Sequence, residues 1–226
     1  DTGALARTGY SFQGWADNSN GTGTLYLPSL AAKTYTVNLS NVTFYAVWEK
    51  VTYKVSYNVD GGSSVLPSTY QIGDSITLPS GPTKSGYTFA GWTVASDGTG
   101  TVLSSSSTVT AGTSNITFYA KWSPVARTVT YALNSGTGTT PTQLTGKYIG
   151  DTFSTSVATG FSRTGYSFTG WSDGTNIYSA NSTYTVAGTD VVLTAQWAAV
   201  SYSVTFLSNG ATSGAAPTQA NLTAGQ

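Results

Sequence analysis

The 226-residue chain contains no cysteine, no methionine and no histidine. Without cysteine it can form no disulfide bond, no thiolate metal site and no cysteine nucleophile. Without histidine, neither a Ser-His-Asp nor a Cys-His catalytic arrangement can be assembled from its residues. We therefore predict that the protein is not an enzyme and has no catalytic residues, no metal site and no cofactor.

Charged residues are also scarce, because nine Lys and Arg balance nine Asp and Glu and the charged residues make up 8% of the chain. Proteins bind the phosphate backbone of nucleic acids through basic side chains, so nucleic acid is not an expected partner. No apolar run approaches the roughly 20 residues that span a bilayer, so we expect no membrane insertion in this segment. The Thr/Ser/Gly/Tyr-rich composition is typical of bacterial surface fibres and predicts an extracellular location at the bacterial cell surface.

Internal repetition is the main feature of the chain. The motif Gly-Tyr-x-Phe-x-Gly-Trp occupies residues 9–15, 86–92 and 165–171, at offsets of 77 and 79. A second motif ends in Trp48, Trp122 and Trp197, at offsets of 74 and 75, so all six Trp belong to the pattern. A period of this length indicates an array of similar modules, which disfavours functions that need one asymmetric active site.

The period divides the chain into four parts. The first repeat, residues 1–50, is the later two-thirds of a module, and the fourth repeat, residues 200–226, is the opening third. The second repeat, residues 51–124, and the third repeat, residues 125–199, are complete. Links of only a few residues between them predict neighbours that are close together and stiffly coupled.

Alternating residues predict about five short strands in each complete repeat and no convincing helix. Tyr53, Val55 and Tyr57 alternate with polar residues in an opening strand. The Gly-Tyr-x-Phe-x-Gly-Trp segment predicts a strand with an aromatic core face and a local irregularity at glycine. Asn20-Gly21 and Asp97-Gly98 predict hairpins after it. The predicted core residues are Tyr10, Phe12, Trp15, Trp48, Tyr87, Phe89, Trp92, Trp122, Tyr166, Phe168, Trp171 and Trp197.

The order of these motifs, from an opening Val-x-Tyr/Phe strand through Gly-Tyr-x-Phe-x-Gly-Trp and a hairpin glycine to Phe-Tyr-Ala-x-Trp, resembles the internalin-type B repeat, or Listeria-Bacteroides repeat, over essentially the whole chain. The resemblance implies a small β-grasp-like, ubiquitin-like module without enzymatic activity, used in tandem on bacterial surface proteins as a stalk, spacer or adhesive segment. The grasp helix has no clear amphipathic counterpart here. We therefore predict a mainly β protein, with β-grasp-like modules of about 75 residues in an elongated array.

Three further features have a chemical and a structural interpretation. Aromatic rings could stack on sugars, although the core explains most of them, and the candidate ligand-contact residues in exposed loops are Tyr26, Tyr70, Tyr148 and Tyr178. Residues 17–21 carry oxygen ligands that could hold Ca²⁺, but a polar hairpin turn is favoured. Asp74 and Asp151 follow Ile-Gly at equivalent positions, and a turn role is favoured because a hydrolase needs two carboxylates in one site.

The two partial repeats together make up one module. Either the chain is a window from a longer periodic protein, which we favour, or the tail of one molecule completes the head of the next. In the second case Tyr202, Val204 and Phe206 form a donor strand and the contact propagates into a filament.

We predict a non-enzymatic structural repeat protein that acts as a surface stalk, spacer or filament subunit. Its expected partners are neighbouring repeats or copies of itself. The alternative is an adhesin module that binds cell-surface glycans or a host protein through exposed loop aromatics.

Overall fold

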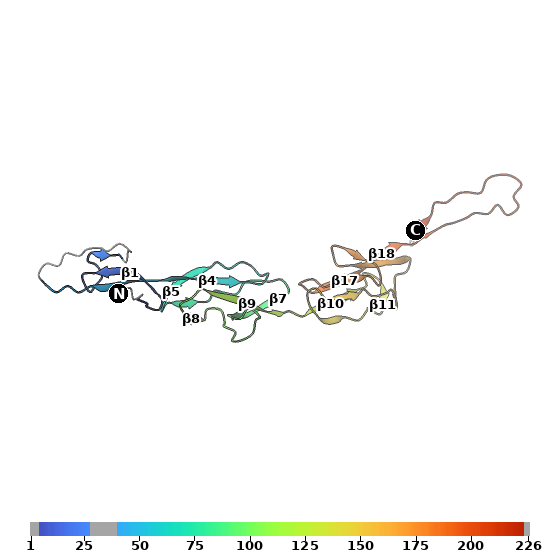
Figure 1. The fold of residues 1–226 in the computed structure, drawn as a ribbon. Coiled ribbons are helices and arrows are strands. Elements are labelled where there is room, and N and C mark those ends of the chain that lie inside the picture. The colour runs from blue at the N-terminus through green and yellow to red at the C-terminus, as the bar shows by residue number, and fades with distance from the viewer. Residues whose placement is uncertain (1–4, 28–39, 224–226) are drawn as a thin grey trace. The chain divides into compact units, whose positions relative to one another are not determined.

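The computed structural model describes residues 5–27 and 40–223 of the chain (Figure 1). Every regular element among these residues is a β-strand, and none of them is helical, which confirms the mainly β prediction. The residues form two compact units, one of Asp1–Lys84 with Phe89–Ser123 and the other of Ser85–Thr88 with Pro124–Gln226. The division falls inside the second Gly-Tyr-x-Phe-x-Gly-Trp segment, whose first residues belong with the repeat that follows.

The strands are short, as the alternating sequence predicts. Strands β1 to β9 are β1 (Tyr10–Ala16), β2 (Leu25–Tyr26), β3 (Tyr45–Lys50), β4 (Thr52–Asn58), β5 (Ser68–Gln71), β6 (Ser75–Thr77), β7 (Tyr87–Thr93), β8 (Thr108–Thr110) and β9 (Ile116–Pro124). Strands β10 to β20 are β10 (Arg127–Ala132), β11 (Thr137–Gly138), β12 (Leu144–Lys147), β13 (Thr152–Ser154), β14 (Phe161–Ser162), β15 (Tyr166–Ser172), β16 (Ile177–Tyr178), β17 (Thr183–Thr185), β18 (Val191–Ala199), β19 (Ser201–Tyr202) and β20 (Leu222–Thr223).

Both complete repeats are built around the same mixed sheet. In the second repeat the strand order is β5-β4-β9-β7, and in the third it is β12-β10-β18-β15-β16. The opening strand pairs in antiparallel fashion with β5 in the second repeat and with β12 in the third. It pairs in parallel with the last strand of its repeat. Small two-stranded sheets, β6-β8 in one repeat and β11-β14 and β13-β17 in the other, accompany it.

Each complete repeat has its own hydrophobic core. In the second repeat Trp92 is fully buried among Val55, Tyr70, Leu78 and Phe118. In the third repeat the fully buried Trp171 occupies the same place, with these residues around it: Val129, Phe161, Tyr184, Val186, Leu193 and Ala195. The indole N–H of each donates to a backbone carbonyl, that of Pro79 at 3.2 Å or that of Ser156 at 2.8 Å. A buried indole with a satisfied N–H suits the centre of a small module.

The first repeat differs at this position, because Trp15 in the three-stranded sheet β2-β1-β3 is 38% exposed. Its ring contacts Phe12 at 5.5 Å between centroids. In the complete repeats the equivalent Trp ring is also covered by a tyrosine of the opening strand, Tyr57 at 5.1 Å or Tyr131 at 4.7 Å. The opening strand of each complete repeat therefore contributes to the burial of this Trp.

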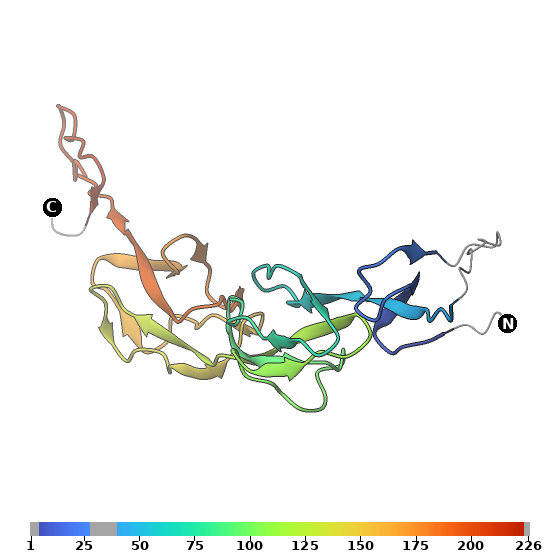
Figure 2. The same cartoon turned by 90° about the vertical axis from the view of Figure 1, so that its left-hand side faces the viewer.

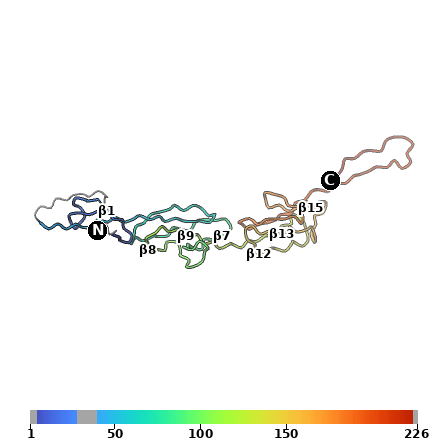
Figure 3. The backbone as a smooth tube through the Cα atoms, viewed as in Figure 1, coloured from blue at the N-terminus to red at the C-terminus, as the bar shows by residue number. Residues whose placement is uncertain are grey.

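In the described residues of the fourth repeat, 200–223, one short sheet pairs β19 with β20. Between these strands the chain runs out and returns as an open loop (Figure 3). Tyr202, Val204 and Phe206 are 53%, 40% and 46% exposed. The residues that occupy the place of Val204 in the complete repeats, Val55 and Val129, are fully buried.

Candidate functional site at the repeat junctions

The first glycine of each Gly-Tyr-x-Phe-x-Gly-Trp segment marks a junction with the next repeat. Gly9, Gly86 and Gly165 have φ of 79°, 79° and 78°, a left-handed conformation that glycine adopts without strain. Their carbonyl oxygens accept hydrogen bonds from the N–H groups of Val51, Val125 and Val200, each at 2.9 Å. Each bond therefore joins a repeat to the first residues of the repeat that follows.

An isoleucine of the following repeat lies directly against this glycine. A β-carbon on Gly9 would lie 2.7 Å from the Ile72 side chain, and one on Gly86 would lie 2.7 Å from Ile149. Such approaches are closer than a real β-carbon allows, so only glycine fits at either position. Within each unit the junction is thus a tight contact between an isoleucine and a bare backbone.

The isoleucine is held in place by the turn that carries it. Asp74 Oδ2 accepts a hydrogen bond from the N–H of Gln71 at 2.8 Å, and Asp151 Oδ2 accepts one from Tyr148 at 2.9 Å. The Asp74 carbonyl also accepts from Ala111 N–H at 2.9 Å, as that of Asp151 does from Val186 at 2.8 Å. Both aspartates therefore close an Ile-Gly-Asp turn, the role favoured for them over catalysis.

A basic residue precedes each Gly-Tyr pair. Arg7 lies over the Tyr10 ring at 3.9 Å from its centroid, and Arg163 lies over the Tyr166 ring at 3.8 Å. Lys84 takes this place in the second repeat and forms an ion pair with Asp60 at 3.1 Å. A guanidinium group over the face of a tyrosine ring is attracted to it by a cation–π interaction.

The four tyrosines predicted to lie in exposed loops differ in their surroundings. The prediction is wrong for Tyr70, which is 5% exposed in β5, packs in the core and donates its hydroxyl hydrogen bond to the Ser114 carbonyl. Tyr26 and Tyr178 are half-buried in β2 and β16, and the Tyr178 hydroxyl donates to Asp173 Oδ2 at 3.1 Å. Tyr148 is 42% exposed, so a ligand contact through its ring remains a prediction.

The polar hairpins use their carboxylates internally. Asp17 Oδ1 accepts from Thr24 N–H at 3.2 Å, and Asp97 Oδ1 accepts from the N–H of Thr99 at 2.9 Å. Hydrogen bonds from the Thr99 hydroxyl and then from the Thr99 backbone N–H lower the pKa of Asp97. The bond to Asp17 supports the hairpin interpretation of residues 17–21 over a Ca²⁺ loop. In the described part of the chain no three His, Cys, Asp or Glu residues gather as metal ligands would.

The comparison with known families agrees with this pattern. A sequence model of the Listeria-Bacteroides repeat domain matches residues 2–47, 53–121 and 128–196. The chain belongs to this repeat family. Three stretches of a Listeria-Bacteroides repeat thus coincide with the three Gly-Tyr-x-Phe-x-Gly-Trp segments, and the resemblance seen in the sequence is confirmed.

Longer proteins are similar to this chain in sequence. A protein of Evansella cellulosilytica, described by its name as a Gly-rich membrane protein, is 33% identical over 218 residues, which are 93% of this chain and 23% of that protein. Internalin H of Listeria monocytogenes is 33% identical over 119 residues, which are 53% of this chain and 20% of internalin H. The chain therefore spans about a quarter of these relatives or less. Its described residues include no helix that is long and apolar enough to cross a membrane.

Proposed function

We propose that these Listeria-Bacteroides repeats form a non-enzymatic spacer of a bacterial surface protein, in which modules joined one after another separate the parts of the protein on either side. The observation that carries the proposal is the repeated junction, in which Ile72 contacts Gly9 and Ile149 contacts Gly86. A spacer needs neighbouring modules to keep a defined separation. The isoleucine packs so tightly against the glycine that it fixes this separation. The relation to internalin H supports a location at the cell surface.

Fluorescence energy transfer tests the spacer directly. The chain has no cysteine, so dyes can be placed at Asn20→Cys and Thr175→Cys, two exposed hairpin positions. A second copy of residues 51–124 inserted after position 124 should lower the transfer efficiency strongly. A Gly/Ser linker of the same length is the matched control, and it should lower the efficiency less because a flexible chain lengthens only with the square root of its residue number. Equal efficiencies for the two insertions would overturn the proposal.

We also propose that each complete repeat is a helix-free variant of the β-grasp fold. In support, the opening strand lies at the centre of the sheet between the strand that follows it and the last strand of the repeat, in the order β5-β4-β9-β7. Parallel pairing of the first and last strands is the arrangement of β-grasp sheets. Between β5 and β7, where a grasp helix would otherwise cover the sheet, the chain forms the short strand β6 and loops.

A second candidate function is glycan binding by the third repeat. A hollow of 590 Å³ there is lined by Tyr131, Thr139, Pro141, Leu144, Ser154 and Thr159, among others. This volume falls within the roughly 300–1,000 Å³ of ligand pockets, and the lining carries hydroxyl groups and no formal charge. A neutral oligosaccharide such as cellotetraose is the matching probe. Chemical-shift changes at these residues that weaken in Tyr131→Phe, which removes the hydroxyl group and keeps the ring over Trp171, would support binding. An unchanged spectrum of the wild type would remove this candidate.

Assembly of the 226-residue chain into filaments is a finer form of the spacer hypothesis. Trp15 and Val204 are 38% and 40% exposed, whereas their equivalents in the complete repeats are fully buried. Residues 201–206 of one molecule could therefore cover the first repeat of another, as an opening strand covers its own repeat. Light scattering of the wild type should then show an average mass that grows with protein concentration. The Val204→Asp variant should have the mass of a monomer at every concentration. In a longer array, a flanking repeat supplies the same strand within one chain.

A further inference from the structure

The first and last strands of each complete repeat lie side by side and run in the same direction (Figures 1 and 2). In the second repeat, residues 55–58 of β4 lie opposite residues 116–119 of β9. In the third repeat, residues 129–132 of β10 lie opposite residues 191–194 of β18. The same four-residue parallel ladder therefore occurs in both repeats.

This pairing decides how tension along the chain acts on a repeat. The chain enters each complete repeat at the start of its opening strand and leaves it at the end of its closing strand. Because these two strands are parallel, a pull on both ends drives them past each other lengthwise. All hydrogen bonds of the ladder then resist the pull together, whereas a pull that opens the strands from one end would break them in succession.

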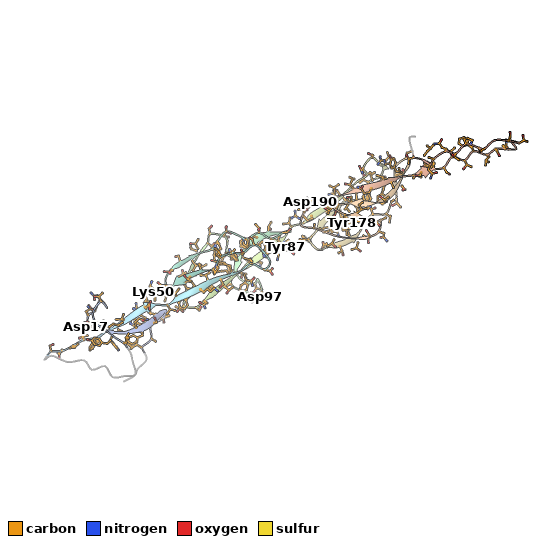
Figure 4. All side chains as sticks on the ribbon, turned by 90° about the horizontal axis from the view of Figure 1, so that it is seen from above. Asp17, Lys50, Tyr87, Asp97, Tyr178 and Asp190 are labelled. Carbon is orange, nitrogen blue, oxygen red and sulfur yellow. The ribbon has the colours of Figure 1, made fainter. Side chains whose placement is uncertain are left out.

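A side-chain hydrogen bond extends the ladder at its start. The side-chain oxygen Oδ1 of Asn115 accepts from the backbone N–H of Lys54 at 2.8 Å. In the third repeat, Oδ1 of Asp190 accepts from the N–H of Thr128 at 2.9 Å. Each of these residues directly precedes the closing strand, and each fixes the opening strand one residue before the ladder begins. Asp190 is labelled in Figure 4.

A tryptophan extends the ladder at its other end. The indole N–H of Trp122 in β9 donates to the carbonyl of Val59, just after β4, at 3.1 Å. The indole N–H of Trp197 in β18 donates to the carbonyl of Leu133 at 2.9 Å. These are the tryptophans of the second sequence motif. The motif therefore places a hydrogen-bond donor where the opening strand ends.

The ladder is also shielded from water on its inner face. Val55 of β4 and Phe118 of β9 are fully buried, as are Val129 of β10 and Leu193 of β18. Water competes for backbone hydrogen bonds and weakens them, so a ladder with one buried face opens less readily.

From these observations we propose that each complete repeat resists tension through a clamp, made of the parallel ladder and the two side-chain hydrogen bonds that flank it. The proposal rests on the spacer function, because a spacer in a surface protein comes under tension when the outer part of that protein is held. Shear of this clamp, and not the small sheet β6-β8, sets the force at which the repeat unfolds.

Single-molecule force spectroscopy on the full chain tests the clamp by changing only the direction of pulling. Handles at Thr52→Cys and Ser123→Cys load β4 and β9 in shear. Handles at Thr52→Cys and Thr113→Cys pull the adjacent ends of the same two strands apart. We expect the unfolding force in the first geometry to be at least about twice that in the second, because the ladder bonds share the load only in shear. Equal forces would overturn the clamp.

A pair of variants tests the flanking hydrogen bonds in the shear geometry. Asn115→Ala removes the acceptor for Lys54 and should raise the unfolding rate under force about fivefold, the equivalent of about 1 kcal/mol for a lost hydrogen bond. Asp97→Ala, which removes the Thr99 contact in a hairpin outside the clamp, should leave this rate unchanged. Equal effects of both variants would contradict the proposal.

The two proposals can fail separately. The energy-transfer experiment measures separation without applied force, and the pulling experiment measures resistance whatever the separation. If energy transfer indicated a flexible chain and pulling gave a high unfolding force in shear, the spacer proposal would be overturned and the clamp proposal would stand.

Discussion

Glycine occupies two positions in every Gly-Tyr-x-Phe-x-Gly-Trp segment, for different physical reasons. The first lies against an isoleucine of the following repeat. The second lies where the strand pairing shifts register, after Phe12 in β1 and after Phe168 in β15. A β-carbon on Gly14 or Gly170 would lie 2.5 Å from the carbonyl oxygen of the neighbouring strand. The bulge therefore brings two backbones so close together that no side chain fits between them.

Substitution of the bulge glycine should be costly. In the second repeat Gly91 has φ of 137°, and a β-carbon there would lie 2.7 Å from the Leu103 carbonyl oxygen. We expect Gly91→Ala to lower the free energy of unfolding by more than about 1 kcal/mol. Gly112→Ala is the control, because that site lacks a positive φ and has nothing within 4 Å. Urea unfolding of both variants measures the difference, and equal stability would contradict this account of the bulge.

Asp173 gives the third repeat a pH dependence. Its pKa is lowered first by the backbone N–H of Asn176, at 2.7 Å, and further by Thr175 and Tyr178, against the opposing effect of burial. A carboxyl group with a lowered folded-state pKa adds stability above its unfolded pKa, and this stability is lost as the pH falls through the folded pKa.

We therefore expect Asp173→Asn to melt at a lower temperature than the wild type at pH 7. The difference should shrink below about pH 4, where carboxyl groups become protonated. Thermal unfolding followed by circular dichroism between neutral and acidic pH measures it. A difference that stays constant over the whole range would mean that the Asp173 charge contributes nothing.

At the scale of elements, local sequence patterns predict the strands better than their partners. The alternation from Tyr53 to Val59 corresponds to β4. The aromatic segment corresponds to β7 and to the equivalent strands β1 and β15 of the other repeats. Asp97-Gly98 lies in a turn, as expected. Each of these features depends on residues close together in the chain, whose backbone preferences are visible in the sequence.

Long-range pairing was not predictable in the same way. Nothing in the local pattern indicates that β4 lies beside β9, about 60 residues later, because register across such a distance is set by packing. The burial of Tyr70 follows from this sheet, since β5 pairs with β4 and places Tyr70 opposite Tyr53. Asn115 and Asp190 directly precede β9 and β18. Their equivalent positions in consecutive repeats were the available signal for a shared role.

The junction should couple the stability of neighbouring repeats. Ile72 belongs to the second repeat and contacts Gly9 of the first, within one compact unit. We expect Ile72→Ala to speed amide hydrogen exchange in β1 and β3 as well as in β5, because removal of the side chain leaves a gap between the two repeats. Val94→Ala, at a position that is 58% exposed, is the matched control. Faster exchange confined to the second repeat would show that the repeats are not coupled.

At the scale of the whole molecule, the repeated hydrophobic cores supply most of the stability, and interactions between charged groups contribute little. Lys84 and Asp60 form the ion pair found within residues 5–27 and 40–223, and charged residues are 8% of the chain. Each core instead groups aromatic and aliphatic side chains around one buried Trp. Modules of this kind are stabilised by their own core and by the contact with each neighbour.

The protein should therefore tolerate large changes in salt. Between about 0.02 M and about 0.5 M NaCl, exposed charges change from weakly to strongly screened. We expect the midpoint of thermal unfolding to move little over this range, as calorimetry can measure. Lys84→Gln should behave like the wild type at both concentrations, because a surface ion pair contributes about 1 kcal/mol or less. A midpoint that falls steeply with salt would point to electrostatic stabilisation that these contacts do not explain.

The equivalence of the junctions has a genetic consequence. Ile72 packs against Gly9 as Ile149 packs against Gly86, at the same distance. The carbonyl of each glycine also accepts the same backbone hydrogen bond from the next repeat. A recombination event that removes or duplicates one whole repeat therefore joins a matching glycine to a matching isoleucine and creates no new interface. Gene segments of this kind can change length in steps of one repeat, so related strains can differ in repeat number while every remaining module keeps its neighbours' contacts.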